Sequence, residues 1–400
     1  MINFKNFLSL KDDNLIDGRI GLLCNQVSFD PETRKYLFQL LAERSNLKRI
    51  FLPEHGMFAE LQDMIPLDST HLYDYLKLDT EIISLYGESE STLTVQPEHL
   101  ADLDALVIDI QDVGSRYYTF ATTVSYIFDV LAKSDHRLEI YILDRLNPCG
   151  RQVEGTILTE EYSSFVGRPG LPHKHGLTIG ELCRFYESQL GADLHLHIIP
   201  LFSDFIDRVR QFSPVTTWSI PPSPNMPGPV TPLVYTGQCL LEGTNVSEGR
   251  GTTRPFEIFG APFMDWIFER SDYPKQPGAF LRPLRFIPTF QKHAGKICSG
   301  FQLHLTGEPY HSLAHSLKII RYLKENSGEA FQWRREVYEF RDDRLAIELL
   351  AGSKILLDYL NGRYDFPIVQ QAFDEDEEKW IDQIESHLIY PEKLYRVTQS

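Results

Sequence analysis

The chain has 400 residues, of which 42% are hydrophobic and 24% are charged. A chain of this length and ordinary composition exceeds one compact core, so we expect a globular protein of two domains. The net charge of −17 disfavours nucleic acid and anionic membrane surfaces as partners, because both recruit basic proteins.

The first half of the chain alternates short β-type apolar runs with helical patterns. Expected strands cover residues 19–26, 47–53, 81–86, 104–110, 138–143 and 194–201, and expected helices cover 31–46, a short stretch from 97, 117–134 and 178–190. Alternation of this kind implies right-handed βαβ crossovers and a mostly parallel sheet covered on both faces. We therefore predict a Rossmann-like α/β domain over residues 1–222.

The second half has a different texture. Residues 221–229 are rich in proline and cannot be helix interior or central strand, and a polar glycine-rich loop follows at 242–253. A strand at 298–305 and helices at 312–325 and 344–360 then predict a smaller α/β domain over 223–400. We interpret the acidic run 374–378 as the solvated start of a C-terminal helix, where carboxylates complement the helix dipole.

The cysteines and the apolar runs indicate in which cellular compartment the protein is expected. The five cysteines are far apart and include no CxxC pair, so we expect buried thiols rather than disulfides or a zinc site. No apolar run is long enough to span a membrane or to form the centre of a signal peptide. The sequence therefore predicts a cytoplasmic protein, or a periplasmic or secreted one if the chain is a mature form. It predicts nothing about the oligomeric state.

Polar side chains follow four of the expected strands where they end, in the stretches 25–26, 53–56, 111–116 and 144–148. Ligands bind beyond the carboxyl ends of the strands in open α/β sheets, so these junctions predict an active site. Glu54 lies on a stiff turn and would suit a general acid, with a helix cap or turn residue as the alternative. Asp112 is placed to bind sugar hydroxyls or to act as a second carboxylate, unless it forms an internal salt bridge with Arg116.

Two histidines raise the question of a metal. His173 and His175 are separated by one residue and would fit a metal-dependent hydrolase together with Glu54 and Asp112. Because such a pair alone defines no complete set of ligands, we expect no metal. The first strand is followed by no glycine fingerprint, which argues against a dinucleotide cofactor.

Taken together, these motifs resemble those of the NamZ-type exo-β-N-acetylmuramidases. The resemblance runs from about residue 15 to the C-terminus, and its main stretches are 53–56, 109–119, 143–148, 164–167, 175–182, 222–227 and 242–256. Two departures are visible. The family often has an aromatic residue and then Arg-Gly after Gly56, whereas Met57-Phe58-Ala59-Glu60 follows here, and Leu146 stands in place of a usual proline.

The resemblance implies a cleft between the two domains that hydrolyses, without a cofactor, the β-1,4 bond of a non-reducing terminal N-acetylmuramic acid in peptidoglycan fragments. It also implies that Glu54 is catalytic. We interpret Glu54 as the general acid, with Asp112 or Glu248 orienting the 2-acetamido group or activating water. The lactyl carboxylate of muramic acid calls for a cation, for which the candidates are Arg116, Arg145 and Arg250. The other residues expected to bind substrate are Asn25, His55, Tyr118, His175, Asn225 and Asn245. A non-catalytic muropeptide-binding protein is the remaining alternative.

Overall fold

The computed structural model describes residues 7–10, 17–44, 46–66, 72, 80–201 and 220–397. Its first half contains a six-stranded sheet with the order β5-β4-β1-β6-β7-β9, and every pair of neighbours is parallel. The strands are β1 (Arg19–Cys24), β4 (Asn46–Leu52), β5 (Glu81–Ser84), β6 (Ala105–Asp109), β7 (Glu139–Leu143) and β9 (Leu196–Ile199). The α/β fold with a parallel sheet is confirmed.

Both faces of this sheet are covered, which explains its continuously apolar strands. Successive residues alternate between the faces, so Leu23 packs in one buried cluster and Leu22 in another. The helices α5 (Phe120–Leu131) and α6 (Ile179–Leu190) cover the first face, and α3 (Leu37–Arg44) covers the second. The strand order reverses at β1, where open α/β sheets form their binding crevice.

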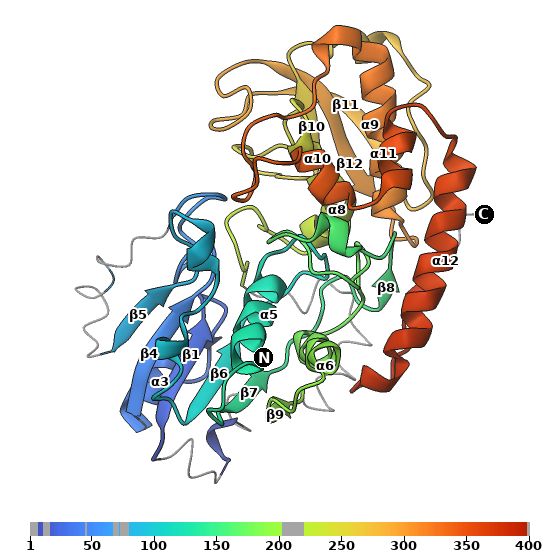
Figure 1. Ribbon diagram of the computed structural model, residues 1–400. Coiled ribbons are helices and arrows are strands. Elements are labelled where there is room, and N and C mark those ends of the chain that lie inside the picture. The colour runs from blue at the N-terminus through green and yellow to red at the C-terminus, as the bar shows by residue number, and fades with distance from the viewer. Residues whose placement is uncertain are drawn as a thin grey trace.

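The second half is built around a three-stranded antiparallel sheet with the order β10-β12-β11. Its strands are β10 (Ile258–Ala261), β11 (Ala279–Phe286) and β12 (Cys298–Leu305), and its helices are α8 (Val230–Gln238), α9 (Ser312–Ser327), α10 (Ala346–Ala351), α11 (Lys354–Leu360) and α12 (Phe366–Ile384). Figure 1 shows α12 running along one side of both halves.

Short elements complete the described chain. The two-residue strands are β2 (Phe29–Asp30), β3 (Lys35–Tyr36), β8 (Gln152–Val153) and β13 (Tyr395–Arg396), and the 3₁₀ turns are Glu90–Leu93, Pro97–His99, Glu160–Tyr162, Cys239–Gly243, Asp265–Glu269, Gly328–Ala330 and Glu385–His387. Strand β13 pairs with β8, so the end of the chain returns to the first half.

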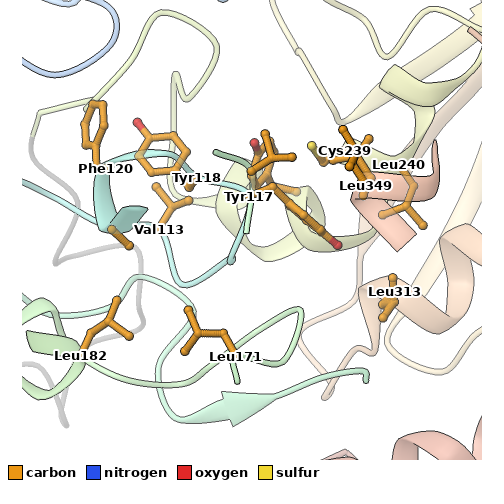
Figure 2. Packing of buried hydrophobic residues seen from close by; sticks show 14 of the residues in the cluster. Val113, Tyr117, Tyr118, Phe120, Leu171, Leu182, Cys239, Leu240, Leu313 and Leu349 are labelled. Atoms are coloured by element: carbon orange, nitrogen blue, oxygen red, sulfur yellow. The ribbon is translucent and has the colours of Figure 1, made fainter. Parts of the chain in front are cut away.

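One hydrophobic core passes through both halves. Figure 2 shows Tyr117 and Leu171 of the first half near Cys239 and Leu313 of the second, and all four belong to one buried cluster. All five cysteines are buried and have free thiols. Among the described residues, no helix has the length and apolar character needed to cross a membrane.

Three helix predictions were wrong in detail. The helix expected from residue 31 begins at Leu37, because residues 29–36 form the β2–β3 hairpin. The helix expected over 344–360 is divided into α10 and α11 at Gly352, whose φ of 54° ends α10. The acidic run lies in the middle of α12, and its Glu377 is buried rather than solvated.

Candidate active site

A pocket lies beyond the carboxyl ends of β4 and β6, between the parallel sheet and the second half of the chain. The volume inside it that is open to the centre of a water molecule is about 40 Å³. It is lined by Glu54, His55, Asp63, Tyr117, Tyr118, Thr119, Val166, Ser223, Asn225, Met226, Tyr235, Glu242, Arg250, Phe256, Tyr338 and Glu339. The strand ends of the first half and loops of the second half therefore meet in one site.

Glu54 directly follows Pro53 at the end of β4, and only 4% of its surface is exposed. The hydroxyl of Thr119, the residue before α5, donates to Glu54 Oε2 at 2.7 Å. The backbone NH of Met64 donates to Glu54 Oε1 at 3.3 Å. Two donors from different segments thus fix the direction of the carboxylate.

His55 forms the turn that presents Glu54. Its φ is 74°, and the φ of Gly56 is 85°, so two successive residues adopt the left-handed conformation. The ring Nδ1 of His55 lies 3.0 Å from the carbonyl oxygen of Leu61 and donates to it, because a carbonyl can only accept. This bond ties the turn to the segment that follows it.

Tyr118 and Asn225 were expected to bind substrate, and both line the pocket. The ring of Tyr118 packs against Phe120 with 4.8 Å between centroids. The amide Nδ2 of Asn225 donates to Gln62 Oε1 at 2.7 Å, across from the proline-rich stretch to the loop after β4. Both side chains are held by protein contacts on one side while they face the pocket.

Arg250 of the glycine-rich loop is surrounded by carboxylates. Its Nη1 lies 3.0 Å from Asp63 Oδ1, its Nη2 donates to Glu242 Oε1 at 2.7 Å, and its Nε lies 3.3 Å from Glu248 Oε1. Burial opposes the charge of the guanidinium, but these three carboxylates outweigh it and raise the pKa of Arg250. The guanidinium is therefore already neutralised by the protein.

Sequence reasoning missed three carboxyls that line this pocket, Asp63, Glu242 and Glu339. Tyr86 donates its hydroxyl to Glu339 Oε2 at 2.9 Å. Burial, followed by the negative charge of Glu54, raises the pKa of Glu339 well above its ordinary value. Glu242 lies in the stretch 242–256 that resembles the family, whereas nothing in the sequence around Asp63 or Glu339 indicates a site.

A second pocket adjoins the first and shares Asp63 and Glu242 with it. The volume inside it that is open to the centre of a water molecule is about 570 Å³, far more than in the first pocket. The remaining lining residues are Met64, Thr244, Asn245, Glu248, Gln291, Lys292, His293, Gln332, Trp333, Arg334, Arg335 and Glu336. This second pocket carries most of the positive charge near the site.

Two of the predicted site residues, Asn245 and Glu248, line the second pocket and not the first. The side chain of Asn245 bridges to neighbouring backbone, donating to the carbonyl of Ala330 at 2.8 Å and accepting from the NH of Gln332 at 3.0 Å. Glu248 accepts from Lys292 Nζ at 2.8 Å. Burial opposes the ionisation of Glu248, but the charges of Lys292 and Arg250 outweigh it and lower its pKa.

Asp112 and His175 form a buried pair outside the lining of the pocket. The NH of Leu177 donates to His175 Nδ1 at 3.1 Å, and His175 Nε2 donates to Asp112 Oδ2 at 3.1 Å. The NH of Gly114 donates to the same carboxylate oxygen at 2.5 Å. Asp112 therefore does not form the salt bridge with Arg116 that was the alternative. Its bond to His175 stiffens the loop after β6.

Asn25 and Arg145 also hold loops together at this edge of the sheet. Asn25 accepts from the NH of Val27 at 3.1 Å and donates to the carbonyl of Pro222 at 3.3 Å. Arg145 donates to Asp109 Oδ1 at 2.7 Å and to the carbonyl of Val27 at 2.9 Å. Neither side chain lines the pocket that contains Glu54.

Arg116 is fully buried between the two halves, where its donors meet backbone carbonyls. Nη1 donates to the carbonyl of Thr156 at 3.0 Å, and Nη2 donates to those of Leu350 and Ala351 at 3.1 Å each. Burial lowers the pKa of Arg116 to about 10, so the guanidinium stays charged at neutral pH. Arg116, expected to bind substrate, does not line the pocket of Glu54, and its charge faces the C-terminal end of α10.

His173 is part of the same buried contact. Its Nε2 lies 2.9 Å from Arg116 Nη2 and 3.0 Å from the carbonyl oxygen of Ala351. Burial and the charge of Arg116 lower its pKa well below the ordinary value. In the described part of the chain, no three His, Cys, Asp or Glu side chains are grouped so that they could hold a metal ion.

The parallel sheet, the second domain and the carboxyl-lined pocket where they meet define a two-domain α/β protein with an acidic site between its domains. Two family models match almost all of the chain. The N-terminal model of the exo-β-N-acetylmuramidase NamZ matches residues 20–230, and the C-terminal model matches residues 233–390. The chain therefore belongs to the NamZ family of exo-β-N-acetylmuramidases, which are glycosidases.

Individual relatives agree with this assignment. The chain is 36% identical over 321 residues to the peptidoglycan β-N-acetylmuramidase NamZ of Bacillus subtilis, covering 79% of this chain and 75% of the relative. Two solved structures of DUF1343 family proteins from Bacteroides fragilis have the same fold. One has a TM-score of 0.75 at 24% identity, with 97% of this chain and 96% of that chain covered. The other has a TM-score of 0.70 at 26% identity, with 98% of each chain covered.

Proposed function

We propose that the protein is an exo-β-N-acetylmuramidase that hydrolyses the β-1,4 bond of a non-reducing terminal N-acetylmuramic acid in peptidoglycan fragments. The observation that carries the proposal is the position of Glu54. The glutamate of the family's strand-end motif lies buried in a pocket that both domains line. The activity named for the Bacillus subtilis relative supports the same substrate class.

In this mechanism Glu54 is the general acid that protonates the glycosidic oxygen as the bond to the anomeric carbon breaks. The contacts from Thr119 and Met64 hold its carboxyl in place for that transfer. Glycoside hydrolysis also needs a second group that activates water or orients the acetamido group. Asp112 is paired with His175 outside the lining, so it is poorly placed for that role.

The two adjoining pockets would divide the substrate between them. With the glycosidic bond that breaks placed at Glu54, the rest of the substrate would extend into the larger second pocket across Asp63 and Glu242. Arg250 is already neutralised by three carboxylates, whereas Arg334 and Arg335 add positive charge to the second pocket. We assign the carboxylates of the substrate to these two arginines rather than to Arg250, Arg145 or Arg116.

The test is the release of free N-acetylmuramic acid from a disaccharide in which it is β-1,4-linked to N-acetylglucosamine. Glu54→Gln should lower kcat by about 100-fold or more, because removal of a general acid costs that much. Glu60→Gln is a matched control, since Glu60 is exposed and lies on the same turn. Equal turnover by Glu54→Gln and wild type would remove Glu54 from the mechanism.

Two further outcomes would replace the proposal itself. Wild-type protein that binds the disaccharide tightly but releases no sugar after long incubation would be a muropeptide-binding protein. Activity that a chelator abolishes and zinc or manganese restores would indicate a metal-dependent hydrolase.

A further inference from the structure

Glu339 is held in the pocket by a hairpin with a strained backbone. Tyr338 and Arg341 pair through two backbone hydrogen bonds of 3.1 and 3.0 Å, which leaves Glu339 and Phe340 as the turn residues. Their φ angles are 47° and 65°, in the left-handed region that such turns require and that asparagine and glycine normally occupy. Strain of this kind persists where the surroundings enforce it, and it gathers at functional sites.

Contacts with the first domain enforce this conformation. The ring of Phe340 packs against Tyr86 with 5.5 Å between centroids, and Arg341 Nη1 donates to the carbonyl of Ser163 at 3.0 Å. The hydroxyl of Tyr86 also donates to Glu339 Oε2 at 2.9 Å. The carboxyl of Glu339 therefore has a fixed place in the pocket, although it comes from the second domain.

The charges around Glu339 are mostly negative. Glu54, Asp63 and Glu242 line the same pocket, and Arg250 is the cation among the lining residues. Arg250 is engaged by Asp63 and Glu242, which leaves Glu54 and Glu339 without a cationic partner in the lining. Burial and a neighbouring negative charge both favour the protonated form of a carboxyl. The raised pKa of Glu339 agrees with this arrangement.

We propose that Glu339 is the second catalytic carboxyl of this site and shares one proton with Glu54. This inference rests on the proposed function. Glu54 gives the shared proton to the glycosidic oxygen, which leaves with the electrons of its bond to the anomeric carbon. The oxygen of a water molecule bonds to that carbon, and the proton of the water passes to Glu339. The pair then holds one proton again, and its return to Glu54 restores the starting state.

The first test is the kinetics of Glu339→Gln on the muramic-acid disaccharide. Its kcat should fall by about 100-fold or more while KM stays within about threefold, because the lost interaction serves the transition state. Asp342→Asn removes an exposed carboxylate beside the same hairpin and should match wild type. A Glu339→Gln enzyme with kcat within threefold of wild type would overturn the proposal.

The pH dependence of kcat separates a catalytic role from a structural one. In Glu339→Gln, Glu54 loses a negative neighbour, so the alkaline limb of the residual activity should move to lower pH. In Tyr86→Phe, the ionised form of Glu339 loses a donor, so the alkaline limb should move to higher pH. Loss of packing alone would not move the two limbs in opposite directions, and unchanged limbs in both variants would contradict a shared proton.

A titration that needs no activity keeps this inference separate from the proposed function. In wild-type protein with ¹³C-labelled glutamate carboxyls, one signal should titrate well above the ordinary range of glutamate, disappear in Glu339→Gln and move to lower pH in Glu54→Gln. If wild type released no sugar, the proposed function would fail, and this titration would still decide whether the pair shares a proton. A Glu339 signal that titrates in the ordinary acidic range would overturn the inference. Should Glu339→Gln not fold, the signals of Glu54→Gln and Tyr86→Phe decide the matter.

Discussion

Arg116 is a buried arginine that links the two domains outside the pocket of Glu54. Arg116 gives hydrogen bonds to carbonyls of the first domain and to the last carbonyls of α10, and it is 1% exposed. Nη1 and Nη2 of its guanidinium find carbonyl partners while Nε has none, and the charge faces the negative end of a helix. Lysine cannot replace this arginine, because its single ammonium group cannot donate to carbonyls on both sides at once.

Arg116→Lys should therefore lower the free energy of unfolding by about 2–4 kcal/mol, as expected when buried polar groups lose their partners. The measurement is urea unfolding followed by circular dichroism. The KM for the disaccharide, measured well below the melting temperature, should stay at the wild-type value. Arg168→Lys is the control, because Arg168 is half-buried and pairs with Asp129, and such a change should cost less than about 1 kcal/mol. A raised KM with unchanged stability would restore Arg116 as a substrate ligand.

At the scale of elements, α6 shows how local sequence fixes the start of a helix beside the site. Thr178 accepts from the NH of Glu181 at 3.2 Å, and Glu181 Oε2 accepts from the NH of Thr178 at 3.0 Å, which completes a capping box. The hydroxyl of Thr178 also donates to Asp144 Oδ2 at 2.9 Å. The cap thereby joins the start of α6 to the end of β7.

Thr178→Ala should destabilise the protein by about 1–2 kcal/mol, because it removes the cap and one donor to the buried Asp144. Burial already raises the pKa of Asp144 to about 6, and loss of the donor should raise it further. Thr178→Ser keeps the hydroxyl and should recover most of the loss in thermal unfolding. Equal melting temperatures for the alanine variant and wild type would show that the cap contributes nothing.

The elements differ in how far the sequence predicts them, and the reason is the range of the interactions involved. Hydrophobic runs and the cap at Thr178 are local, so β12 and α6 lie close to where they were expected. The break between α10 and α11 falls at Gly352, whose positive φ ends α10 and which the expected helix passed over. A Cβ there would also lie 2.3 Å from Leu158 Cδ1 and 2.5 Å from Arg116 Nη2, and no periodicity within the helix reveals those contacts.

The same distinction applies to the site. Glu54 belongs to a motif at a strand end, so its place beside Tyr118 in the pocket followed from topology and resemblance. Glu339 lies on a hairpin without glycine or asparagine, and its turn gives no signal in the sequence. Arg116 and Asp112 are polar residues near the same strand end, and only the three-dimensional contacts show that they stabilise loops instead of lining the pocket.

At the scale of the whole molecule, a buried charge cluster joins the two domains. Glu154 and Lys174 form an ion pair in the first domain, and His311 at the start of α9 lies 3.3 Å from Glu154 Oε2. Nε2 of His311 lies 3.2 Å from Glu377 Oε1 in α12. All four side chains are at most 2% exposed. Because two carboxylates face one ammonium, a protonated His311 makes the cluster neutral, which a buried site requires.

This neutrality predicts how stability depends on pH. Burial opposes the charge of His311, but Glu154 and Glu377 outweigh it and raise the pKa from the ordinary 6.5 to about 9 in the folded protein. A group whose pKa rises on folding stabilises the protein fully below its unfolded pKa, and that contribution is lost as pH rises through the folded pKa. The free energy of unfolding should therefore fall by up to roughly 3 kcal/mol between pH 6.5 and pH 9.5.

The measurement is urea unfolding at several pH values in that window, for wild type and for His311→Gln. The variant should be less stable at pH 6.5 but much less sensitive to pH, so the two curves should converge as the pH rises. On the acidic side, burial opposes the ionisation of Glu154, but Lys174 and His311 lower its pKa from the ordinary 4.5 to about 2. Its contribution should therefore be complete above pH 4.5 and be lost as the pH falls from there toward 2. Parallel curves for wild type and variant above pH 6.5 would mean that His311 is neutral and that the two domains are joined without its charge.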